Sequence, residues 1–449
     1  MSDPSNTGGG GSDKAAAAMH DLERPLEHIS EAKFREIARL LEEVHEQPGV
    51  QRILDHVRPR LAKLRPGRKP NLQRLFYQPL EDLLVPDGAP PNNGLLPRHL
   101  VALVWRQVVK TGDAETRKRF EDALRRAKAD DRATQAAVAK ELWPWAAAII
   151  AAVAGNQGAA KAMLGSHAGL LPELIEVATL LELAPAVERL KAELPPRPIH
   201  GLADEQMGQI RRIIADSTGG DAQKVYVMVL IAMVRMAKRA DFLESIMGMT
   251  LGLAATDKSA VYMRLSRLVM TEISDRARQM AETDRANLVG LADSARSLVT
   301  GVVAAERALK NDPQARRELS EMRKSAEKTV SQVVDTAKGA VTVAIAEGPG
   351  AGLEAQVETE NNILALRKCQ TFANHIGLDR AVEGALGGIV GEVRQKADGL
   401  FTALRAADSE APPRDTAQQQ MYWAVRMTEL AGNPDDADKL RRDGLKAIG

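Results

Sequence analysis

The stretch PQARRELSEMRKSAEKTVSQVVDTAKGAVTVAIAE, residues 313–347, decides the fold class of this chain. Pro313 suits the first turn of an α-helix, where no backbone N–H is needed, and the segment Gly348–Gly352 ends the helix. Apolar side chains recur every eleven residues in two series: Leu319, Val330 and Val341, and Met322, Val333 and Ala344. This period corresponds to about 3.67 residues per turn, close to a straight helix. The stretch therefore predicts one long helix packed in a bundle, not a left-handed coiled coil.

Apolar stripes with helical spacing extend through most of the remaining chain. Towards the C-terminus they predict helices over 353–375, 378–407, 415–431 and 434–447. Towards the N-terminus they predict helices from 98 to 194 with short breaks, then over 203–216, 221–248, 257–283 and 285–310. Runs with the alternation typical of strands are nearly absent. We therefore predict an all-α protein, either an irregular multi-helix bundle or a solenoid-like stack of helical hairpins in two lobes.

A further pair of helices is predicted near the N-terminus. Ser30 can cap the first of them, Glu31 places a negative charge in its first turn, and Pro48-Gly49 ends it. Its apolar stripe is expected to comprise Phe34, Ile37, Leu40, Leu41 and Val44. The second helix is predicted over about 50–64, because Pro66-Gly67 stops it.

Four segments describe the predicted domain organisation. Residues 1–20 are Gly-rich, Ala-rich and polar, which predicts a disordered leader. An N-terminal helical domain is expected over 21–194, interrupted by a Pro-rich irregular segment at 66–97. Prolines at 195, 196 and 198 favour a stiff linker over 195–198, and a C-terminal helical domain follows over 199–449.

Composition limits the classes of function. The chain has 449 residues, with 61 Lys and Arg against 60 Asp and Glu, so its formal charge of +1 gives no whole-protein attraction to nucleic acid or membrane. Its one cysteine, Cys369, allows neither an internal disulfide nor a multi-cysteine zinc site. The apolar runs at 145–154 and 225–234 have about half of the ~20 residues that span a bilayer. We therefore predict a cytoplasmic protein without a membrane span.

The sequence contains no complete motif for catalysis or cofactor binding. None of the eight histidines lies three or four residues from another, and Glu42 and His45 form the one Glu-x-x-His pair, whereas a di-iron bundle needs two. The glycines between 384 and 391 follow no predicted strand, so they match no nucleotide-binding loop. We predict no metal and no cofactor. An enzyme whose site is assembled from distant residues stays as an alternative.

The most distinctive local feature is a basic segment from Arg52 to Arg74. It contains eight Lys or Arg side chains against one acid, Asp55. Such a cluster can bind phosphate groups in a salt-dependent manner, although charge runs beside prolines are more often solvated. The candidate anion-binding residues are Arg58, Arg60, Lys63, Arg65, Arg68, Lys69 and Arg74. The segment makes nucleic-acid or polyanion binding an alternative function.

Methionines concentrate in the middle of the chain. Nine of the 15 fall between Met207 and Met280, where flexible thioethers suit an irregular core or an adaptable partner-binding groove. The candidate partner-binding residues are Met228, Met233 and Met236. Extensive helical surface without an assembled catalytic motif favours a non-enzymatic scaffold or protein–protein interaction protein, whose partner is another protein.

Overall fold

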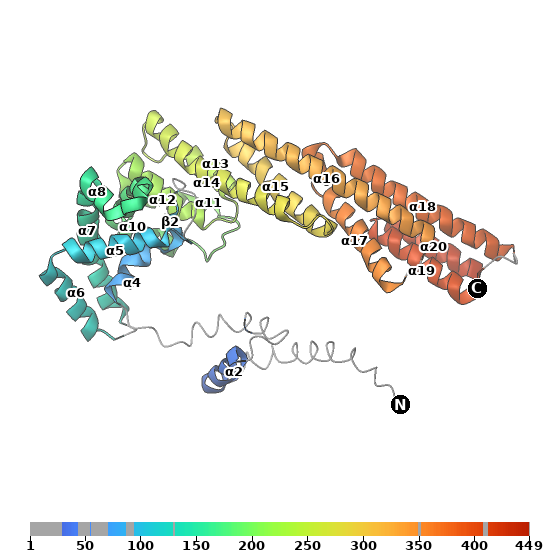
Figure 1. Ribbon diagram of the computed structural model, residues 1–449, viewed down its shortest axis with the longest axis horizontal. Helices are drawn as coiled ribbons and strands as arrows, with labels where there is room; N and C mark the ends of the chain where they lie inside the picture. The colour runs from blue at the N-terminus through green and yellow to red at the C-terminus, as the bar shows by residue number, and fades with distance from the viewer. Residues whose placement is uncertain are drawn as a thin grey trace. The chain divides into compact units, whose positions relative to one another are not determined.

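The computed structural model describes residues 29–43, 54, 71–86, 94–128, 131–348, 352–406 and 412–448. Contacts divide the chain into two compact units. The first comprises Met1–Leu72 and Arg119–Val138, and the second comprises Gln73–Lys118 and Ala139–Gly449. Nearly all described elements are helices, so the predicted all-α class is confirmed (Figure 1).

The first unit contains α2 (Glu31–Glu43) and parts of α6 (Ala114–Arg126) and α7 (Arg132–Ala154). The predicted first helix is thus confirmed, and Phe34 and Ala38 are buried as a helical stripe requires. The prediction for Leu40 is wrong, because its side chain is 56% exposed. Leu54 is buried, but the rest of the predicted helix at 50–64 and the leader at 1–20 lie outside the described residues.

The second unit begins with short elements in the Pro-rich segment. These are α4 (Leu72–Tyr77), the 3-10 helix η1 (Gln78–Leu83), and two-residue strands β1 (Leu84–Val85) and β2 (Leu96–Pro97), which pair in parallel. The indole Nε1 of Trp143 donates a hydrogen bond of 2.9 Å to the carbonyl of Leu75, which fixes α4 against α7. Regular helices follow: α5 (Arg98–Thr111), α8 (Gln157–Leu164), η2 (Gly165–Leu170), α9 (Leu171–Glu182) and α10 (Ala184–Glu193).

The central helices carry the most strongly buried apolar segment. They are α11 (Asp204–Thr218), α12 (Ala222–Val234), α13 (Arg239–Gly248), α14 (Ala255–Glu282) and α15 (Leu288–Ala308). The continuous helix predicted over 221–248 is wrong, because the chain breaks between α12 and α13. There, Ile199 donates its N–H to the carbonyl of Arg235 at 3.0 Å and accepts from the N–H of Ala237 at 2.9 Å. This pairing with a distant residue replaces the helical hydrogen bonds.

The C-terminal helices pack as successive neighbours. They are α16 (Pro313–Glu347), α17 (Leu353–Gln370), the short η4 (Ala373–Ile376), α18 (Asp379–Arg405), α19 (Arg414–Leu430) and α20 (Pro434–Ile448). Figure 1 shows α16 running alongside α15 and α18, with which it is in contact. Of the two eleven-residue series, Leu319, Val330 and Val341 are fully buried, as a bundle helix requires. In the second series only Val333 is buried, whereas Met322 and Ala344 are partly exposed.

Side chains on both sides of the predicted linker at 195–198 meet at one buried carboxylate. Asp82, whose side chain is 6% exposed, accepts from Arg197 at 2.7 Å and from Arg235 at 2.8 Å. Lys191 lies 3.9 Å from the same carboxylate. Residues before and after the linker are therefore joined by charge, and the division at 195–198 stays a prediction.

Two helices are long and apolar enough to cross a bilayer, judged by length and composition alone. They are Arg132–Ala154 and Leu288–Ala308, and 44% of the apolar window of each is buried inside the structure. Core helices of globular proteins pass the same test. The finding is therefore weak evidence on membrane association.

Candidate functional site: a groove between α16 and α17

The hairpin of α16 and α17 is positioned by glycines at its turn. Gly348 ends α16 with a φ of 79° and donates its N–H to the carbonyl of Ala344 at 2.9 Å, and Gly352 precedes α17 with a φ of 89°. Both dihedrals lie in the region that favours glycine. Lys396 of α18 donates to the carbonyls of Ile345 and Ala346, which stabilises the negative end of the α16 dipole.

Small side chains leave a groove of about 300 Å³ between these two helices. On α16 it is lined by Gly339, Ala340, Val343 and Ala344, and on α17 by Ala355, Gln356, Thr359 and Asn362. Trp423 of α19 contributes a partly exposed aromatic wall. The side chain of Val343 is 57% exposed, so the groove presents an apolar group to its surroundings.

The charged groups that line the groove are acidic. Glu347 of α16 and Glu358 of α17 belong to its walls, and none of the described residues lining it is Lys or Arg. Glu354 adds a third carboxylate in the first turn of α17, where it also complements the helix dipole. The groove therefore combines apolar walls with acidic side chains at its edge, and the ammonium of Lys396 lies beside Gly348 at one end.

A separate stripe of exposed apolar side chains runs along α17, on residues that do not line the groove. Leu353, Val357 and Leu364 are 78%, 52% and 40% exposed, and their spacing of four and seven residues places them on one helix face. On the neighbouring α19, Tyr422 is 49% exposed. Of the nine exposed large apolar residues in the described part of the chain, these four and Val343 make five. Such a concentration on adjacent helices is typical of an interaction surface.

A double ion pair joins α17 and α19. The guanidinium of Arg426 donates from Nη2 and Nε to the two carboxylate oxygens of Glu360, at 3.0 and 3.2 Å. The hydrogen bond to Glu360 raises the pKa of the Arg426 guanidinium above its ordinary value. Because two parallel hydrogen bonds fix the relative orientation of the groups, the two helices present their exposed faces in one arrangement.

The residues proposed from the sequence lie elsewhere. Of the seven candidate anion-binding residues, only Arg74 belongs to the described residues, and its side chain is exposed on α4. The other candidates lie outside the described residues: Arg58, Arg60, Lys63, Arg65, Arg68 and Lys69. Met228 and Met233 are fully buried and Met236 is 7% exposed, so all three contribute core packing in this conformation. None of the groove residues was predicted as a site from the sequence. Val343 could have indicated one, because it is apolar and belongs to neither eleven-residue series.

A buried polar cluster joins α9, α12 and α14. Glu176, only 3% exposed, accepts a hydrogen bond of 2.8 Å from Arg264, whose guanidinium lies 3.6 Å from the centre of the Tyr226 ring. Burial raises the pKa of Glu176 to about 7, against a smaller lowering by Arg264 and a further rise from nearby Glu173. Burial likewise raises the pKa of Tyr226. The cluster contributes a titratable group in the neutral pH range.

Cys369 is fully buried in α17, and burial raises the pKa of its thiol to about 12. This environment is typical of a packing residue. In the described residues, no group of three or more His, Cys, Asp and Glu side chains is arranged to hold a metal ion. Comparison with models of known families, with curated proteins and with solved structures gives no match.

Proposed function

We propose that this chain is a non-enzymatic scaffold protein of the cytoplasm that binds another protein through the groove between α16 and α17. The observation that carries the proposal is the groove itself, where the exposed side chain of Val343 lies among small side chains of α16 and α17 and the partly exposed Trp423. A rigid pair of packed helices with an apolar groove is a recurrent docking surface for a partner helix.

The chemistry of the groove defines its occupant as an amphipathic helix with basic flanks. An apolar anchor side chain of the partner would fill the 300 Å³ space over Val343 and against Trp423. Lys or Arg residues one turn away would meet Glu347 and Glu358 at the rim. Partners with acidic flanks are disfavoured, because like charges would face each other across the contact.

Site-specific crosslinking tests this proposal in the native host. A photoreactive amino acid replaces Val343 in the full chain, and a control chain carries it at Leu445, which is 51% exposed on α20. We expect one protein to be crosslinked from position 343 and not from position 445, through a segment with helical apolar spacing and flanking Lys or Arg.

Affinity for the identified partner supplies the second measurement. The substitution Val343→Glu should weaken binding at least about tenfold, since it places a charge in an apolar contact, whereas Leu445→Glu should leave it unchanged. Crosslinking to the same proteins from both positions, or to acidic segments, would overturn the proposal. Recovery of nucleic acid that is released by salt would instead favour the basic segment from Arg52 to Arg74.

A further inference from the structure

The outer face of α17 carries an apolar stripe that no described element covers. Leu353, Val357 and Leu364 are 78%, 52% and 40% exposed. Helical spacing places them on the side of α17 opposite Asn362 and Leu366, which are both buried. Another molecule can therefore reach the stripe without unpacking the helices of the chain.

A row of polar side chains runs along one flank of this stripe. Glu354, Asn361 and Lys368 are spaced by seven residues, close to two helical turns, so they lie one above another. Glu354 and Asn361 are exposed. Lys368 pairs with Asp293 of α15, and its side chain is still 26% exposed. The row is thus negative at its start, a neutral amide in its middle and positive at its end.

This order of charges complements its own reverse. Consider two antiparallel copies of α17 related by a two-fold axis beside Asn361. Glu354 of each copy then lies opposite Lys368 of the other, because both residues are seven positions from the axis. The carboxamide of Asn361 meets that of the second copy, and an amide can donate and accept at once. On the stripe, Val357 and Leu364 of different copies face each other within one position, four and three residues from the axis.

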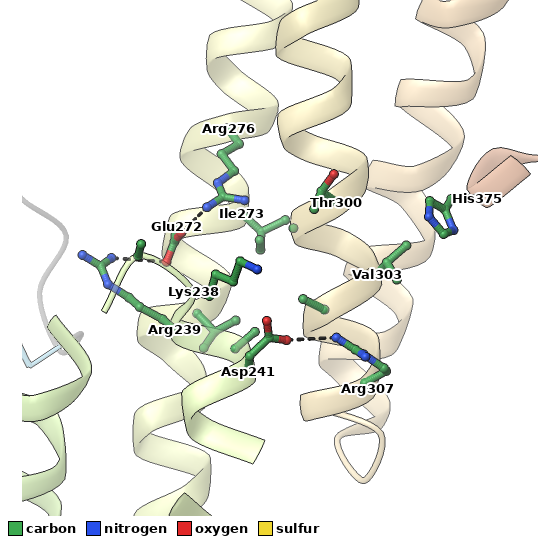
Figure 2. A pocket seen from close by; sticks show the side chains of 15 residues that line it. Lys238, Arg239, Asp241, Glu272, Ile273, Arg276, Thr300, Val303, Arg307 and His375 are labelled. Carbon is green, nitrogen blue, oxygen red and sulfur yellow. Dashed lines mark hydrogen bonds and ion pairs between the residues drawn. The ribbon is translucent and has the colours of Figure 1, made fainter. Parts of the chain in front are cut away.

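Other charged groups of the chain are balanced internally. Figure 2 shows such a case between α13, α14 and α15, where Asp241 pairs with Arg307, and Glu272 pairs with Arg276. Glu354, in contrast, has no ion pair with another described residue. A partner with one sign of charge would meet an opposite charge at only one end of the row. A second copy of α17 meets an opposite charge at both ends.

We propose that this chain forms a symmetric dimer through antiparallel packing of its α17 helices. The dimer buries the apolar stripe of both copies, and the stem of Lys368 covers Leu353 of the other copy at each end. The contact is about one helix face wide, so we expect a weak dimer that exchanges with monomer at micromolar concentration. The stripe residues do not line the α16–α17 groove, so the inference is independent of the proposed partner binding.

Sedimentation of the full chain over micromolar to millimolar concentration tests the dimer. The wild type should shift towards the mass of two chains. Leu364→Asp should weaken dimerisation at least about tenfold, because it places two charges in an apolar contact. Its position is partly exposed, so the circular dichroism spectrum should be unchanged. Val343→Glu, in the groove, is the matched control and should dimerise as the wild type does. A monomeric wild type, or equal weakening by both substitutions, would overturn the proposal.

Crosslinking of introduced thiols tests the antiparallel orientation. With a short bismaleimide, Asn361→Cys should join two copies, because its thiols lie beside the axis. The native Cys369 is buried, so the wild type should not react. Leu353→Cys is the control on the same stripe. Its two copies would be separated by twice the eight residues to the axis, about 24 Å. Crosslinking from both positions would indicate parallel pairing, and crosslinking from neither would indicate no contact. Either result contradicts the proposed dimer.

Discussion

Replacing Glu176 by Gln should remove a large part of the pH dependence of folding stability. Burial raises the pKa of this carboxyl group from 4.5 to about 7 in the folded chain. In the unfolded chain the group is solvated and releases its proton at the lower value. Between the two values the native state therefore holds a proton that the unfolded state has lost, and stability falls as pH rises through this window.

The size of the effect follows from the shift. With folded and unfolded values of about 7 and 4.5, this one group makes the chain less stable at pH 8 than at pH 5 by about 2.5 kcal/mol. Above about pH 8 its contribution is flat. Glutamine keeps the shape and the acceptor oxygen for Arg264, which donates to Glu176 at 2.8 Å, but it does not titrate. The variant should therefore lack this decrease.

Urea unfolding followed by circular dichroism at pH 5, 6 and 8 measures the difference. Glu182→Gln is the control, because Glu182 lies on the same helix but its side chain is 56% exposed in its pair with Lys224. We expect the pH 5 to pH 8 decrease to be smaller in Glu176→Gln by about 2.5 kcal/mol, and to be unchanged in Glu182→Gln. Equal decreases in the wild type and both variants would refute the reasoning.

Three further predictions concern stability and reactivity. Asp82→Asn should destabilise the chain by about 3 kcal/mol or more in urea unfolding, since it leaves buried cations without their carboxylate, whereas Asp275→Asn, at an exposed pair, should change stability by less than about 0.5 kcal/mol. Leu319→Ala, at a fully buried position of α16, should cost about 2 to 5 kcal/mol, and Leu353→Ala, at a position 78% exposed, less than about 0.5 kcal/mol; equal losses would contradict the assigned faces. The thiol of Cys369 should resist a disulfide reagent at pH 8 in the folded chain and react once urea unfolds it, because burial raises its pKa to about 12.

The helices that the sequence predicted well are those with strong local signals at their ends. α16 runs from Pro313 to Glu347 as predicted, because a proline at the first turn and glycines after the last turn act within a few residues. The helix ends near residues 98, 353, 379 and 434 were likewise placed within about two residues. Local residue types were enough to predict these helix ends, because no residue distant in the sequence pairs with the backbone there.

The break at 235–238 had no such signal. The segment from α12 to α13 is apolar and contains neither Gly nor Pro near the break, so helical spacing predicted continuity. What ends α12 is the pair of backbone hydrogen bonds to Ile199, a residue 36 positions away. A pairing of this kind depends on how the chain folds back. The exposure of Leu40 was likewise not predictable from helical spacing, because it depends on what packs against α2.

The candidate binding groove arises where an apolar side chain lies off the buried stripe of its helix. Inside a regular helix the backbone N–H and C=O groups are hydrogen-bonded to one another, and the apolar stripe is buried by packing. Neither is therefore available to a ligand. Val343 is exposed because it lies off the stripe of Leu319, Val330 and Val341 on the same helix. In this all-α chain an apolar residue off the buried stripe is therefore the sequence feature that best agrees with the proposed binding groove.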